Sequence, residues 1–137
     1  MISINRALRA AIRERLLPYW GAVYSGQVPA SEQGAYILLS DVDVTDESTM
    51  STQDISVNIQ IGIYGKQNLA PNSDEVDDIA TDVLNELYPT PDAIVDVDGH
   101  QCTGMTLVSS TEQTLNLNSS QISNRFITFN LKYFYNG

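Results

Sequence analysis

The stretch DISVNIQIGIYGK, residues 54–66, decides the fold. Its apolar side chains occupy every second position: Ile55, Val57, Ile59, Ile61 and Ile63. The positions between them hold Ser56, Asn58, Gln60 and Gly62, and no charge follows until Lys66. A period of two predicts a β-strand with one apolar and one polar face. We therefore expect the apolar face to pack on a core and the other face to be polar but uncharged.

Further strands are predicted on both sides of this one. AYILLSDVDV (35–44) and RFITFNLKYFYNG (125–137) have apolar or aromatic side chains at alternating positions. The segment DAIVDVDGHQCTGMTLVSS (92–110) predicts a short strand, a turn at Asp98 and Gly99, and a longer strand. The Gly- and Pro-rich segment 18–34 reads as a loop with one short strand at 22–24.

Two segments have the spacing of amphipathic helices. The first runs from a cap at Ser3 to Leu17, with an apolar stripe of Ile4, Leu8, Ala11 and Ile12. The second is PNSDEVDDIATDVLNELYP (71–89), where Asn72 or Ser73 is the cap and Glu75 completes a capping box. Its apolar stripe is Val76, Ile79, Ala80, Val83, Leu84 and Leu87.

The order of these elements predicts an α+β fold. Helix, strand, strand, helix, strand, strand gives an antiparallel sheet of four or slightly more strands with the helices on one face. A chain of 137 residues fits one domain, residues 1–137, with one core. The single cysteine excludes an internal disulfide and favours a reducing compartment. We expect neither an export signal nor a membrane span, because no apolar run approaches about 20 residues.

The charge is strongly acidic and unevenly distributed. The net charge is −10, yet residues 1–15 contain four arginines and one glutamate. A largely acidic chain is a poor binder of nucleic acid, because phosphate binding needs clustered Lys and Arg. Arg6, Arg9 and Arg13 share one helix face, which is either solvated or in contact with an acidic neighbour. Asp74, Asp78, Asp82 and Glu86 repeat every four residues, as a solvated face or as an acidic lumen or docking face.

No catalytic or metal-binding motif is apparent. His100 and Cys102 lie two positions apart, but a turn histidine and a core cysteine explain them better than a nucleophile pair. DVDVTDES (41–48) lacks the glycine and distal glutamate of a calcium loop, and DVDG (96–99) lacks a third ligand. We therefore expect no metal and no cofactor.

Two long polar segments, 45–53 and 111–124, are large for so small a domain, and such loops are usually functional or disordered. The second segment reads as a long hairpin tip or arm. We expect them, with the arginine face, to form the interface with other subunits or with a tube. The candidate interface residues are Arg6, Arg9, Arg13, Thr45, Asp46, Glu47, Met50, Leu115, Leu117 and Ile122.

The whole chain resembles the tail-completion, or tail-terminator, proteins of long-tailed bacteriophages. The resemblance lies in the order and spacing of INRALRAAIRERL, GQVP, AYILLSDV, VNIQIGIYGK, SDEVDDIATDVLNEL, GHQCTGMTLVSSTEQ and RFITFNLKYFY. The acidic bias departs from the mixed charge of many relatives.

The resemblance implies a structural virion protein without enzymatic activity. Such proteins form a ring, usually of six copies, at the head-proximal end of the tail tube. The ring ends tube growth, presents a surface to the head-side connector or stopper protein, and lets genomic DNA pass without specific binding. The protein would be made in the host cytoplasm. The alternatives are another neck component, such as a head-closure or tail-tube protein, and an acidic binding module that is not an enzyme.

Overall fold

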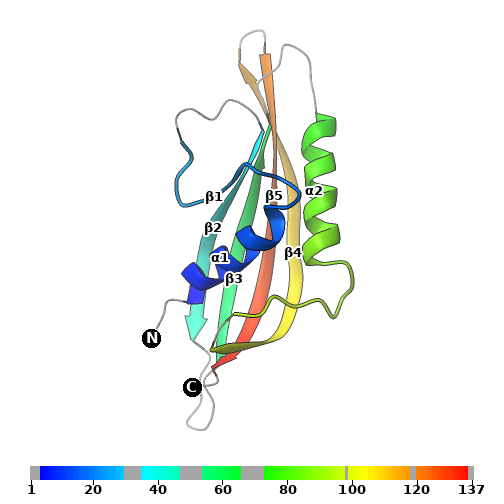
Figure 1. The fold of residues 1–137 in the computed structure, drawn as a ribbon. Helices are drawn as coiled ribbons and strands as arrows, with labels where there is room; N and C mark the ends of the chain where they lie inside the picture. The colour runs from blue at the N-terminus through cyan, green and yellow to red at the C-terminus, as the bar shows by residue number, and fades with distance from the viewer. Residues whose placement is uncertain are drawn as a thin grey trace.

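The computed structural model describes residues 4–29, 35–46, 54–65, 73–97, 99–117 and 120–135. Two helices and five strands follow one another along the chain: α1 (Ile4–Leu16), β1 (Val23–Ser25), β2 (Tyr36–Asp46), β3 (Asp54–Tyr64), α2 (Ser73–Leu87), β4 (His100–Leu117) and β5 (Ser120–Tyr135). The strands form one sheet in the order β1-β2-β3-β5-β4. Figure 1 shows α1 lying obliquely across the sheet and α2 running alongside the strands.

The α+β class is confirmed, but the sheet is mixed rather than antiparallel. The pairs β2–β3, β3–β5 and β5–β4 are antiparallel, whereas β1 pairs with β2 in parallel. The added strand is the short one expected at 22–24, which lies at Val23–Ser25. The parallel direction of this strand was not predicted. The preceding helix crosses the sheet, so the chain reaches the β2 edge running in the same direction as β2. Three residues hold no pattern from which a direction follows.

Both helices pack on the same face of the sheet, as expected. The buried residues of α1 are Ile4, Leu8, Ile12 and Leu16, one per turn. α1 contacts β1, β2 and α2, while α2 packs on β5 and β3. The apolar positions of β3 from Val57 to Ile63 are fully buried beneath them, as the alternation predicted. Within the described residues, no helix is long and apolar enough to cross a membrane.

Two predictions about the C-terminal half were wrong in detail. Most of 111–124 is strand rather than loop, and it forms the expected hairpin arm, because β4 and β5 stay paired until Leu117 meets Ser120. The outer part of this hairpin lies beyond the core, so neither of its faces needs apolar side chains. Its polar sequence therefore has no apolar period from which a strand could be predicted. The short strand expected before the turn at Gly99 is reduced to one bridge between Val97 and His100. Val95 and Val97 are nevertheless buried.

Tyr133 gives a pH-dependent prediction. Its side chain is 1% exposed and its hydroxyl donates a 2.7 Å hydrogen bond to the Val95 carbonyl. Burial raises the pKa of the Tyr133 hydroxyl well above its ordinary value, and Cys102 adds to this shift. Above about pH 10 the unfolded tyrosine loses its proton while the folded one keeps it. Stability is therefore retained below this pH and lost as the pH rises beyond it.

We expect the free energy of unfolding to fall by up to about 1.4 kcal/mol per pH unit above pH 10 on account of this single group. Tyr133→Phe should remove that part of the slope. At neutral pH the variant should lose about 1–3 kcal/mol, because the Val95 carbonyl is left without its donor. Urea unfolding of both proteins between pH 7 and 11.5 checks this, and identical slopes would contradict it.

Candidate assembly surfaces

The helix-free face of the sheet is polar and internally hydrogen-bonded. Asn130 on β5 donates from Nδ2 to Ser56 Oγ at 2.8 Å and to Asn58 Oδ1 at 2.9 Å, both on β3. Asn58 in turn donates to Asp43 Oδ1 on β2 at 2.6 Å. The polar side chains predicted for one face of 54–66 are thus part of a network across three strands, which includes the charged Asp43 and whose members hold one another in place.

An aromatic row crosses one end of this same face. Tyr36 stacks on Tyr64 with ring centroids 5.0 Å apart, and Tyr24 meets Tyr36 edge-on at 6.1 Å. Phe126 completes the row against Tyr64 at 5.6 Å. The row spans β1, β2, β3 and β5. Gly62 makes it possible, because a Cβ at that position would lie 2.8 Å from the Tyr64 ring.

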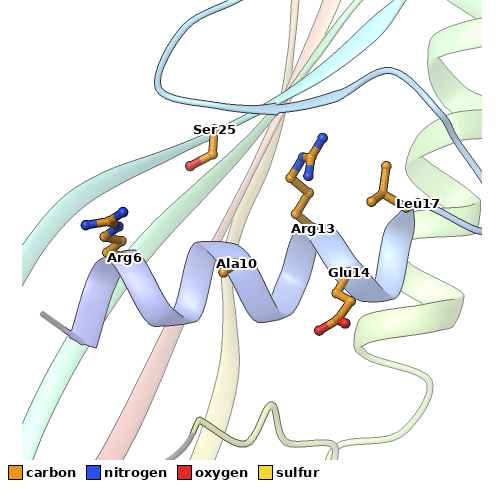
Figure 2. Close-up of a pocket in the computed structure, with 6 residues that line it drawn as sticks. All are labelled: Arg6, Ala10, Arg13, Glu14, Leu17 and Ser25. Atoms are coloured by element: carbon orange, nitrogen blue, oxygen red, sulfur yellow. The ribbon is translucent and has the colours of Figure 1, made fainter. Parts of the chain in front are cut away.

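The arginine face of α1 borders an open pocket of about 470 Å³. Figure 2 shows Arg6 and Arg13 rising from the side of α1 toward Ser25, while Glu14 leaves the helix on another side. Arg9 Nε donates to Ser25 Oγ at 2.9 Å, and Arg13 Nε donates to the Val23 carbonyl at 2.8 Å. These two arginines therefore hold α1 against β1. Arg6, which is exposed, is the described arginine best placed to meet another molecule.

The acidic residues of α2 differ from one another in their surroundings. Asp78 is exposed, and Asp74 lies in the first turn of the helix. Asp82 accepts a hydrogen bond from Trp20 Nε1 at 3.3 Å. Glu86 pairs with Arg15, with Nε and Oε1 3.4 Å apart. A lumen or docking role for these four acids stays a prediction, and Asp78 and Asp82 are exposed.

Glu86 also belongs to a contact that fastens the end of α1 to α2. Arg15 donates from its terminal nitrogens to the carbonyls of Glu86 at 2.6 Å and Ile94 at 3.3 Å. A hydrogen bond to Glu86 raises the pKa of the Tyr19 hydroxyl, and the charge of Glu86 adds to the effect. Trp20 is partly buried and packs against the core.

The predicted interface residues are divided between opposite ends of the sheet. At one end, Thr45 is exposed near the end of β2, Asp46 closes that strand, and β3 begins at Asp54. At the other end, Leu115 of β4 lies opposite Ile122 of β5, and Leu117 ends β4. Glu47 and Met50 lie outside the described residues. The structure therefore brings together the members at each end but separates the two groups along the strands (Figure 1).

Cys102 is a core residue, as the preferred interpretation predicted. It is 5% exposed, and its thiol lies 3.5 Å from the Gly104 carbonyl. His100 is also buried and meets Tyr133 edge-on. Both positions belong to the packing at the end of the sheet.

Arg125 was missed as a structural residue by sequence reasoning. Its terminal nitrogens reach Asp77 of α2 at 2.8 Å, and Ser110 at 3.1 Å and Glu112 at 3.6 Å on β4. Its side chain is only 21% exposed. Arg125 thus joins the hairpin to α2. One sequence feature could have indicated this role: Arg125 lies two positions before Ile127, so both side chains are on the apolar face of the strand.

Comparison with known proteins gives likeness in structure alone, since no family model and no curated protein matches the chain. A chain of the virion of a native gene transfer agent particle superimposes with a TM-score of 0.76 at 17% identity, covering 98% of this chain and 99% of that one. The fold is one found in virions. The gp17 protein of bacteriophage SPP1 is similar in structure, with a TM-score of 0.51 at 17% identity, covering 97% of this chain and 91% of that one. Both neighbours are consistent with the tail-completion resemblance.

Proposed function

We propose that this chain is a tail-completion protein that forms a ring at the head-proximal end of a phage-type tail tube. The ring ends tube growth and offers its other rim to a head-side connector or stopper, with DNA passing through the lumen. The observation on which the proposal rests is end-to-end likeness to a virion chain, with 98% and 99% of the two chains covered. The proposed role is structural, without enzymatic activity.

The geometry of the subunit supports this role. A ring between a tube and a connector needs two different rims and side-by-side contacts between copies. The candidate interface residues gather at opposite ends of the strands, which suits two rims. The Arg6 surface remains for a contact with a neighbouring copy or with the tube. The partners proposed are therefore other copies of this chain, the tube protein and the connector.

Electron microscopy of particles produced without this chain tests the proposal. Because nothing would stop the tube from growing, tails should vary widely in length and heads should stay unattached. Supplying the chain from a plasmid should restore one tail length and head attachment. Normal-length tails joined to heads in its absence would contradict the proposal.

A further inference from the structure

In the part of the chain that the structure describes, the two outer sides of the sheet are unpaired over much of their length. Among the described residues, β4 pairs only with β5, although it is 18 residues long. On the other side, β1 covers only Ile37–Leu39 of β2. The stretch Ser40–Asp46 therefore has no described strand on its outer side. Unpaired backbone groups of this length are a template for another strand.

Exposed apolar side chains gather on these same edges. The exposed large apolar residues within the described ranges are Tyr19, Val44, Ile94, Leu107 and Val108. Val44 lies in the open stretch of β2 at 41% exposure, and Leu107 and Val108 lie on β4 at 36% and 57%. From Thr106 to Thr114 nearly every β4 residue is exposed, so neither face of this stretch is covered. Solitary strand edges usually avoid such residues.

Charge favours pairing one edge with the other rather than with itself. The stretch 40–46 contains three aspartates, so two copies of it would repel each other. β4 contains one acid, Glu112, and neither the lysine nor the proline that commonly blocks an edge. The β4 edge of one copy, with its single acid, is thus a better partner for the acidic edge of another than a second acidic edge would be.

The directions of the two edge strands, and their positions along the sheet, also suit this pairing. Three successive antiparallel pairs separate β2 from β4, so the two edge strands run in opposite directions. Following the ladder, Ser40 lies level with Ser109, and Val44 lies level with Met105. In copies related by rotation about an axis along the strands, β4 of one copy meets β2 of the next in the antiparallel sense.

We propose that β4 of each copy pairs with Ser40–Asp46 of the next, so that the sheets join edge to edge around the assembly. The inference rests on the proposed ring and identifies the contact between adjacent copies, which we call the seam. The contact is head-to-tail, using a different surface on each copy, and so it can close a ring.

Cysteine pairs tested inside assembled tails examine this seam. In a Cys102→Ser background, Val44→Cys is combined in turn with a cysteine at Thr103, Thr106, Val108 or Ser110, and tails are treated with a short bismaleimide. These positions cover registers on both sides of the level one. At least one pair should give a ladder of covalent oligomers. Val44→Cys with Asn85→Cys, an exposed α2 position, is the control and should give none.

The outcomes separate this seam from the proposed function. Absence of oligomers for all four pairs, in tails that contain the variants, would overturn the seam and leave tail completion standing. Dimers from Val108→Cys alone would mean that β4 pairs with itself, which also overturns it. Absence of the chain from tails would instead count against the proposed function.

Hydrogen exchange of the unsubstituted chain provides a second test of the seam, which does not depend on any substitution. Amides in 40–46 and 104–114 should exchange at least about tenfold more slowly in tails than in the free chain, because they gain partners on assembly. Equal rates in both stretches would overturn the seam.

Discussion

Tails assembled with Arg6→Glu should contain about tenfold less of this chain, or lose it altogether. Arg6 is exposed beside the pocket between α1 and Ser25, where it can meet an acidic group of a neighbour or of the tube. A reversed charge at such a contact costs several kcal/mol, and each 1.4 kcal/mol is about tenfold in affinity. Quantitative mass spectrometry of purified tails measures the loss.

Position 6 separates assembly from folding better than its neighbours do. Arg9 and Arg13 bond to Ser25 and to the Val23 carbonyl, so reversing them would also loosen α1. Arg6 lies in the first turn of α1, which contains no acidic residue. A glutamate there interacts favourably with the helix dipole, by about 0.3–1 kcal/mol. The variant should therefore fold at least as well as the parent.

Two controls complete this experiment. Arg6→Lys keeps the charge and should retain most of the assembly. Lys132→Glu makes the same change in charge at an exposed position on β5, away from α1, and should also assemble. If Lys132→Glu were as defective as Arg6→Glu, net charge rather than the Arg6 surface would be responsible.

Gly65→Ala should cost about 2–4 kcal/mol of stability, among the larger effects of a single methyl group. Gly65 follows β3, and its amide donates a 2.9 Å hydrogen bond to the Ser123 carbonyl of β5. An added Cβ would lie 2.4 Å from that carbonyl oxygen and 2.9 Å from Val76 Cγ2 of α2. Backbone on one side and a buried side chain on the other leave no room, so strand or helix must shift.

Gly104→Ala is the matched control. A Cβ at position 104 meets no atom within 4 Å, and its φ is not positive. The substitution should be neutral or stabilising by about 0.4–1 kcal/mol, since it restricts the unfolded chain. Denaturant unfolding of both variants should show a lower midpoint for Gly65→Ala alone, with an unchanged m-value. Equal midpoints would contradict the close approach at Gly65.

Elements with a strong period were predictable from the sequence. The alternation in 54–66 predicted the buried face of β3, and the spacing in 4–16 and 73–87 predicted both helices and their inner stripes. These patterns are clear because each of these elements turns one face toward the core and the other away from it. The direction of β1 and the extent of the β4–β5 hairpin were not predictable, since β1 is three residues long and the outer hairpin is exposed on both faces.

The candidate surfaces were predictable only in part. The shared face of Arg6, Arg9 and Arg13 follows from helical spacing. Which of these arginines bond to β1 depends on how the chain folds back against α1, and spacing alone does not reveal that. Likewise, the ion pair of Glu86 with Arg15 joins residues 71 positions apart. The Tyr24–Tyr36–Tyr64–Phe126 row requires the strand order, because its four rings come from four strands.

The separation of the two predicted interface groups along the strands has a consequence for how this protein can diversify. The ends of β2 and of the β4–β5 hairpin are joined by a long hydrogen-bonded ladder that needs no change when either end changes. Under the proposed function, a change of connector would be matched by changes at one end, while the other end keeps its contact with the tube. Each end can therefore change in sequence without disturbing the other.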